Sequence, residues 1–405
     1  MQASATSCTS VSQSSRRRVR PHVATMLCLA ALAIVTSHVA AAAGAPLRWE
    51  QWRSLPGVVD VGGPLSTGEL VVAAGSHLFR LARDGTDSEL APAYARAPFT
   101  PPAGSEPYIA VASPEVAATA CPFPRDSVFA LRPAAPGSVV RIDPSGTVTT
   151  FARLPDAGGL NGIVFDTVGR FGHRLIVTGG VSGGHVAVVA IDCHGTATTL
   201  TRTAPQQEGG LAVAPTSFPR YGGDLIGPDE LSGRVVATDP SGASAVIAES
   251  RAPAGGDTGV EAVAFVPPGF LAGGAAYAAD RGTAGSPHPG TDTLLRLSAA
   301  ALAGAGVHEG DMLLTTEASD RIVEIRCATD CAARTLGMGD PAAHGEGHLL
   351  MVADHPRPPP PAAVPITLGG DRNWVVVTIV VAAVAAGIGA ASLALVRRRR
   401  REARR

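Results

Sequence analysis

The stretch that decides the fold spans residues 158–242. It reads GGLNGIVFD (158–166), HRLIVTGG (173–180), HVAVVAIDCHG (185–195) and TATTLTRT (196–203), and then starts again with EGGLAVAP (208–215), GGDLIGPDE (222–230) and GRVVATDPSG (233–242). Apolar and polar residues alternate within these runs, which is the period of a β-strand, and Gly, Pro, Asp or Ser closes each run. Four strands that recur about every fifty residues indicate a repeat fold.

A second copy of this pattern lies further along the chain. Residues 223–236 align with residues 310–323, so that Glu230 falls on Glu317 and Arg234 on Arg321. Six such hairpins can be counted between residues 69 and 330, and four strands per unit of roughly forty to fifty residues define a β-propeller blade.

The sequence therefore predicts an all-β, six-bladed β-propeller over residues 46–353, with five or seven blades as the alternatives. The fifth blade is expected at residues 261–297 and the sixth at residues 308–327. The sixth unit lacks an obvious first strand, and residues 349–352 are the candidate to fill a place in the ring.

The N-terminus has the layout of an export signal. A cluster of arginines at residues 16–20 precedes an apolar run at residues 26–35, and small residues follow up to Ala45. This pattern predicts a signal peptide over residues 1–45, with cleavage after Ala43 or Ala45. Ser15-Arg16-Arg17 leaves a twin-arginine signal open as an alternative.

The C-terminus has the layout of a membrane anchor. Residues 374–396 carry no charge, and a helix needs about twenty such residues to cross a bilayer. The arginine-rich residues 397–405 then predict a cytoplasmic tail, which leaves the body outside the cell membrane. The Pro-rich residues 354–373 are expected to form a stiff stalk. Residues 364–368 resemble a sortase signal, which is the alternative for this end.

Four cysteines remain in the exported part of the chain. An even number outside the cytoplasm suggests disulfides, with three possible connectivities. Cys327 and Cys331 are expected to close a small loop, which leaves Cys121 for Cys193; free buried thiols are the alternative. The formal net charge of −1 implies no nucleic-acid partner.

Three segments carry a resemblance to a known family. They are LNGIVFD (160–166), AYAAD (276–280) and the repeated VVxxDPSG, and with them residues 47–353 resemble the NHL and gluconolactonase-like six-bladed propellers. Gluconolactonase-like members hold a divalent cation in the central channel with oxygen ligands from different blades. Asn161 matches the family's channel Asn, although Leu160 replaces the usual Pro, and Asp280 matches its strand-end Asp.

The internal alignment extends this comparison. It places Glu261 at the position of Asn161, and Asp229 at the position of Asp280. The resemblance therefore implies a calcium site formed by Asn161, Asp229, Glu261 and Asp280, since calcium prefers hard oxygen ligands. The family's first-blade Glu has no counterpart, and the third blade ends with Thr178-Gly179 instead of Asp.

Two other motifs have less specific patterns. Residues 180–184 (GVSGG) fit the nucleophile elbow G-x-S-x-G, but a strand pattern follows where the elbow needs a helix, so a hairpin turn is predicted. Residues 344–348 (HGEGH) do not form the HExxH zinc motif and are expected in a solvated loop near the stalk.

The leading functional expectation is a cell-surface binding module for a protein, glycan or small molecule. The alternative is a calcium-dependent, lactonase-like hydrolase outside the cytoplasm, and a structural envelope protein is the third hypothesis. The lining of the channel discriminates between the first two, because converging oxygen ligands favour the enzyme and an apolar or Arg-lined channel favours binding.

Overall fold

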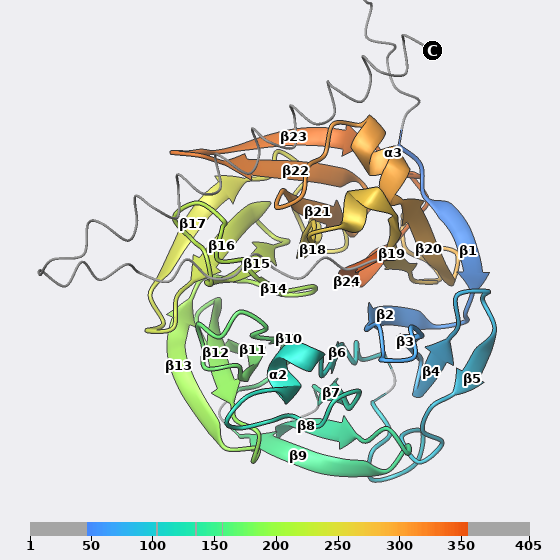
Figure 1. Cartoon of the computed structure of the whole chain (residues 1–405), viewed down its shortest axis with the longest axis vertical. Helices are drawn as coiled ribbons and strands as arrows, with labels where there is room; N and C mark the ends of the chain where they lie inside the picture. Colours follow the sequence, from blue (N-terminus) through green and yellow to red (C-terminus); the bar gives the residue numbers. More distant parts are fainter. Residues whose placement is uncertain (1–46, 103, 134–135, 156, 355–405) are drawn as a thin grey trace, which may run out of the picture. The chain divides into compact units, whose positions relative to one another are not determined.

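The computed structural model describes residues 47–354, apart from residues 103, 134–135 and 156. These residues form six four-stranded antiparallel sheets, and the innermost strands of neighbouring sheets contact one another around a ring, as Figure 1 shows. The six-bladed β-propeller predicted from the sequence is confirmed.

The blades are numbered around the ring, and each is given from its inner to its outer strand. Blade 1 is β2 (Val58–Gly62), β3 (Leu70–Ala74), β4 (His77–Leu81) and β5 (Asp87–Glu89); blade 2 is β6 (Ile109–Val111), β7 (Val128–Arg132), β8 (Gly137–Ile142) and β9 (Val148–Leu154); blade 3 is β10 (Leu160–Phe165), β11 (Leu175–Val181), β12 (His185–Ile191) and β13 (Ala197–Ala204). Blade 4 is β14 (Ala212–Val213), β15 (Leu225–Asp229), β16 (Arg234–Thr238) and β17 (Ser244–Glu249); blade 5 is β18 (Val260–Phe265), β21 (Met312–Thr316), β22 (Ile322–Cys327) and β23 (Cys331–Gly337); blade 6 is β24 (Gly345–Ala353), β19 (Gly274–Asp280), β20 (Thr293–Ser298) and β1 (Glu50–Ser54).

Blades 5 and 6 are interleaved along the chain, which corrects the expected order. β18 pairs with β21, where Val260 lies opposite Thr316, although β19 and β20 come between them in sequence. β19 and β20 belong instead to blade 6, whose inner strand β24 is the last strand of the chain. Residues 349–352 fill a place in the ring as predicted, as part of β24.

The ring closes through strands from both ends of the described chain. β1 is the outermost strand of blade 6 and pairs with β20, so that Glu50 lies opposite Arg296. β24 is the innermost strand of the same blade. Separating blade 6 from blade 1 therefore requires the loss of the ladder hydrogen bonds between β1 and β20.

Asp-x-x-Gly turns join the outer strands of several blades. In blade 2, Asp143 Oδ1 accepts hydrogen bonds from the backbone N–H groups of Ser145 and Thr147, at 2.9 Å each. The glycine that ends this turn, Gly146, has φ 87°, and a Cβ on it would lie 2.6 Å from the carbonyl oxygen of Leu90, which follows the outer strand of blade 1. The glycine thus lets the turn of one blade contact the preceding blade.

The same arrangement recurs in the next blade. Gly195 in the turn after β12 has φ 81°, and a Cβ there would lie 2.2 Å from the carbonyl oxygen of Phe151 in blade 2. The hairpin turn predicted at residues 180–184 is also confirmed, because Val181 at the end of β11 lies opposite His185 at the start of β12.

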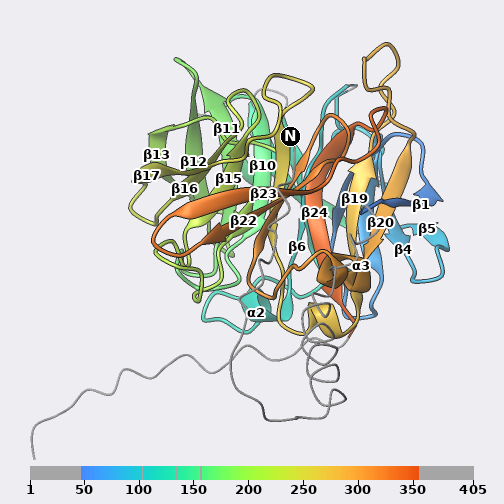
Figure 2. The ribbon, with the colours of Figure 1, turned by 90° about the horizontal axis from the view of Figure 1, so that it is seen from above.

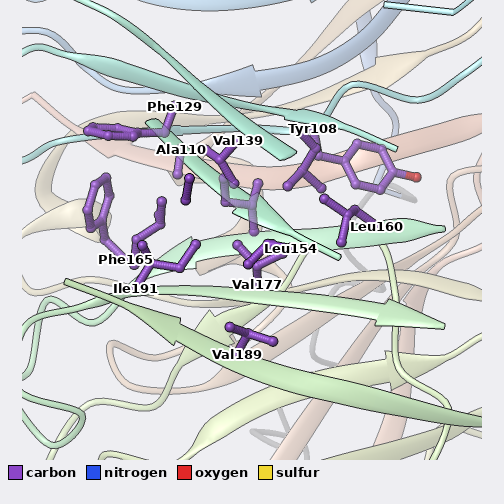
Figure 3. Packing of buried hydrophobic residues seen from close by; sticks show 14 of the residues in the cluster. Tyr108, Ala110, Phe129, Val139, Leu154, Leu160, Phe165, Val177, Val189 and Ile191 are labelled. Atoms are coloured by element: carbon purple, nitrogen blue, oxygen red, sulfur yellow. The ribbon is translucent and has the colours of Figure 1, made fainter. Parts of the chain in front are cut away.

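The largest apolar cluster fills the space between blades 2 and 3 (Figure 3). Phe129 and Phe165 are buried with ring centroids 5.3 Å apart in an edge-to-face arrangement, and Phe123 packs against both rings. A buried Phe side chain contributes roughly 2 kcal/mol of transfer free energy. Blades have this type of interface on both sides, which is why the ring is stable only when closed.

Both predicted disulfides are present. Cys121 pairs with Cys193 and so links the segment after the short helix α2 (Pro114–Ala117) to the β12–β13 turn of the next blade. Cys327 pairs with Cys331 and closes the β22–β23 hairpin. The cysteine pairing inferred from the sequence is therefore confirmed.

The terminal predictions fall outside the described part of the chain. The expected signal peptide (1–45), the transmembrane helix (374–396), the basic tail (397–405) and all of the stalk except Asp354 lie there. Among the residues that the structure describes, no helix is long and apolar enough to cross a membrane.

Candidate active site

One end of the channel gathers polar side chains from the inner and second strands of several blades. Inner strands begin at this end and second strands finish there, because neighbouring strands are antiparallel. Figure 2 shows α2 and the second short helix, α3 (Ala299–Gly304), together on one side of the ring. Both helices follow strands that run away from the polar end, so the candidate site lies on the opposite side.

Two equivalent positions supply most of the site. The second residue of the inner strand is Asn161 in blade 3, Glu261 in blade 5 and Glu346 in blade 6. The residue directly after the second strand is Glu230 in blade 4, Glu317 in blade 5 and Arg281 in blade 6. The repeat therefore brings polar side chains from three blades to each of these two positions.

Tyr108 lies at the centre of the first group of contacts. Its hydroxyl donates a hydrogen bond to Glu346 Oε1 and lies 3.2 Å from Glu261 Oε1. Burial and the charges of these two glutamates raise the pKa of Tyr108 well above its usual value, so the hydroxyl keeps its proton. Arg281 completes this group, because its Nη1 lies 3.0 Å from Glu346 Oε2 and also contacts Glu106.

His344 lies at the centre of the second group. Its Nδ1 is 3.1 Å from the carbonyl oxygen of His288, which can only accept, so Nδ1 carries a proton. Its Nε2 is 3.1 Å from Glu317 Oε1 and 4.0 Å from Glu346 Oε2. All three side chains are buried, and their ligand atoms lie within 4.8 Å of one another.

Carboxyl groups outnumber cations in this site, so several of them retain protons. Burial and the charge of Glu106 raise the pKa of Glu346 to about 7, against the opposing effect of Arg281. Burial and a hydrogen bond shared with Glu317 raise the pKa of Glu230 to about 8. Burial, followed by the charges of Glu346 and Glu317, raises the pKa of Glu261 well above its usual range.

His348, which lies on β24 with Glu346, has a structural role. Its Nε2 lies 2.8 Å from the carbonyl oxygen of Ile163, and its Nδ1 lies 3.0 Å from both carboxylate oxygens of Asp60. Asp60 is fully buried and also accepts hydrogen bonds from the backbone N–H groups of Ile109 and His348. This pair ties the inner strands of blades 1, 2, 3 and 6 together, and it leaves neither ring nitrogen of His348 free.

The four residues expected to bind calcium lie in two different kinds of place in the structure. Asn161 and Glu261 lie in the channel, where Asn161 Nδ2 donates to Glu208 Oε2 at 3.2 Å. Asp229 instead accepts a hydrogen bond from the Ser232 hydroxyl in the following turn. Asp280 accepts from the hydroxyl of Thr291 and, at 2.8 Å, from the backbone N–H of His344.

The alternation of side chains along a strand explains this division. Asp229 and Asp280 end their strands, so the residues that follow them, Glu230 and Arg281, take the channel-facing direction. Among the described residues, no group of three or more metal-ligating His, Cys, Asp or Glu side chains within 4.8 Å includes Asp229, Glu261 or Asp280. The predicted calcium donors are therefore not gathered around one point.

The segment 344–348 corrects the sequence-based expectation of a solvated loop. His344 and Glu346 are buried at 2% and 4% exposure, and Gly345 begins the inner strand of blade 6. The glycines that suggested a loop are required by close contacts, because a Cβ on Gly347 would lie 2.5 Å from Asp60 Oδ1. One sequence signal could have revealed the strand: Glu346-Gly347 repeats the polar-Gly pair of Asn161-Gly162 in blade 3.

Comparison with known proteins finds solved structures of low sequence identity. Similar solved structures include virginiamycin B lyase from Staphylococcus aureus, at 10% sequence identity over 73% of this chain and 78% of that chain, with a TM-score of 0.44. A protein solved as a proposed gluconolactonase is similar at 15% identity over 58% of this chain and 71% of that chain, with a TM-score of 0.36. No family model and no curated protein matches the chain. The six sheets of the structure itself define a six-bladed β-propeller, and its function is argued from its own residues.

Proposed function

We propose that the protein is a metal-dependent hydrolase or lyase that acts on a small substrate at the polar end of the channel. The observation that carries this proposal is the convergence of Glu317, His344 and Glu346. The distances of 3.1 Å and 4.0 Å from His344 Nε2 to the two carboxylates leave room for one ion between these atoms, since metal–nitrogen and metal–oxygen bonds are about 2.0–2.2 Å long.

The donor set favours a transition metal over calcium. One imidazole and two carboxylates suit Zn²⁺ or Mn²⁺, whereas calcium takes oxygen ligands only. The hydrogen bond from His344 Nδ1 to the His288 carbonyl also fits, because a metal-bound histidine usually donates its other N–H to such an acceptor. The ion would supply Lewis acidity or a bound water of lowered pKa.

The chain's own residues supply the remaining chemistry. Arg281 is held by Glu106 and Glu346, so it presents a fixed cation to a carbonyl or carboxylate oxygen of the substrate. Glu230, with a pKa of about 8, is poised to exchange a proton near neutral pH. Tyr108 donates to Glu346 and so fixes the orientation of that carboxylate.

Export and membrane anchoring are part of the proposal. The predicted signal peptide and the apolar span at residues 374–396 favour a single-pass protein of the cell membrane, with the propeller outside and residues 397–405 in the cytoplasm. The two disulfides support an oxidising location. A surface module that only binds a protein, glycan or small molecule is the competing proposal, but a channel lined by converging carboxylates favours catalysis.

A panel of small lactones and esters tests the activity. Hydrolysis or elimination should require added Zn²⁺ or Mn²⁺, stop with EDTA, and fall by roughly 10²-fold in kcat/KM in Glu230→Gln, which removes a proton-exchanging group. The matched control is Glu50→Gln, a carboxylate on the outer strand β1 that pairs with Arg296 far from the channel. Activity that survives EDTA and all channel substitutions would refute the proposal.

A further inference from the structure

A second cavity lies between blades 5 and 6, outside the channel site. Its volume is about 640 Å³, within the range of small-molecule sites. Its walls include the apolar side chains of Leu47, Trp49, Leu295 and Leu336, and Met338 at its edge is 60% exposed, so the cavity is open to solvent there. The proposed catalysis uses none of these residues.

A buried carboxyl group in this cavity has no partner. Asp320 is 1% exposed, and neither of its side-chain oxygens has a hydrogen-bond partner among the described residues. Its backbone is fixed, because the Trp49 indole N–H donates to the Asp320 carbonyl oxygen at 3.0 Å. A buried carboxyl group without a partner is unfavourable when ionised, so a cation that pairs with it favours the ionised form.

The surroundings of Asp320 are acidic. Asp280 and Asp340 also line the cavity. Burial, and to a smaller extent the charges of these two aspartates, raises the pKa of Asp320 well above its usual range. Asp280 is already bonded to Thr291 and to the His344 backbone. Arg48 also lines the cavity, but its side chain is exposed, and its charge does not contribute to the pKa shift of Asp320.

The geometry argues against a metal ion in this place. Among the described residues, the three aspartates do not form a group whose ligand oxygens all lie within 4.8 Å of one another. One ion therefore cannot contact all three as they stand. A cation with an apolar body would instead use both the carboxyl group and the apolar walls, and a nearby indole ring can add cation–π attraction.

We propose that this cavity binds a small organic ammonium compound, with its nitrogen against Asp320 and its apolar part against Trp49 and the leucine side chains. The proposal is independent of the activity assigned to the channel. Because the buried Asp320 carboxyl holds its proton in the free protein, binding of an ammonium ion as the ion pair releases that proton to the solvent. Proton release on binding is therefore a second expected property.

Calorimetry on the full chain tests the proposal with phenethylamine as the probe and 2-phenylethanol as its neutral analogue. The amine is expected to bind at least tenfold more tightly than the alcohol, and titration in two buffers of different ionisation enthalpy should reveal proton release. Asp320→Asn should weaken amine binding at least tenfold, with no fall in the thermal midpoint, because the amide removes an unpaired acid. Both proton release and the preference for the amine should vanish in this variant.

A channel variant separates this cavity from the acidic channel, which could also attract an amine. Glu346→Gln should leave the affinity for phenethylamine within twofold of the wild-type value. Loss of binding in Glu346→Gln with retention in Asp320→Asn would place the amine in the channel and overturn the proposal. Equal affinity for amine and alcohol, or no binding of the amine at all, would overturn it as well.

Discussion

Glu346 should make the metal-free protein less stable as the pH rises, and Glu346→Gln should remove that dependence. The Glu346 side chain is 3% exposed, and its pKa is raised from 4.5 to about 7. The folded protein therefore keeps a proton between these values while the unfolded chain has lost it. The stabilisation is complete below pH 4.5 and is lost as the pH rises through about 7.

The magnitude follows from the same shift. A difference of about 2.5 pKa units corresponds to about 3 kcal/mol in the free energy of unfolding. Glutamine has nearly the shape of the protonated acid and cannot titrate. Relative to the wild type, the variant should be less than about 1 kcal/mol more stable at pH 5 and about 3 kcal/mol more stable at pH 8.

Urea unfolding at pH 5, 6, 7 and 8, with EDTA present, measures this difference. Glu230, Glu261 and His344 also have raised pKa values, so the wild type should lose further stability over this range, and only the difference between the two proteins reports on Glu346. Glu50→Gln, which changes an exposed carboxylate, serves as the control, and its free energy of unfolding should change with pH in the same way as that of the wild type. If the free energy of unfolding of Glu346→Gln also changes with pH in the same way as that of the wild type, the reasoning is refuted.

Three further predictions concern the scaffold and use the free energy of unfolding from urea titration. Replacing both Cys121 and Cys193 by Ser should cost about 4 kcal/mol, and replacing Cys327 and Cys331 about 2 kcal/mol, because the first disulfide closes a loop of sequence separation 72 and the second of only 4; equal costs would contradict this ranking. Phe129→Ala should cost about 4 kcal/mol because the ring is fully buried among other aromatic rings, whereas the exposed Val246→Ala should cost less than about 0.5 kcal/mol. Asp60→Ala should cost at least about 3 kcal/mol, since it leaves buried N–H groups of Ile109 and His348 without acceptors, and a loss below about 1 kcal/mol would show that Asp60 does not join the inner strands.

The sequence predicts the blades well because each strand and turn is a local feature. Alternating runs such as residues 160–165 become strands, and the Asp-x-x-Gly turns fix where outer strands reverse. The assignment of strands to blades 5 and 6 is not a local feature, because it depends on pairing between strands that are distant in the sequence. Residues 260–265 and 274–280 both look like ordinary blade strands, and nothing local shows that the first pairs with β21 and the second with β24.

The candidate site was only partly predictable for the same reason. The repeat predicts equivalent positions for Asn161 and Glu261, and both occupy the second position of an inner strand. It does not show whether Asp229 or the adjacent Glu230 points inward, since that depends on where each second strand ends. Glu346 is predicted from the sequence to lie in a solvated loop because glycines flank it on both sides, but its strand completes a blade begun much earlier in the chain.

X-ray diffraction from crystals grown with Zn²⁺, recorded at the zinc absorption edge, tests the proposed metal site most directly. We predict one anomalous peak in the channel, about 2.0–2.2 Å from His344 Nε2 and from one oxygen each of Glu317 and Glu346. The peak should disappear in His344→Ala crystals. A channel without anomalous density in the wild type, or a peak that persists when His344 is removed, would contradict the proposal that this end of the ring is a metal-dependent active site.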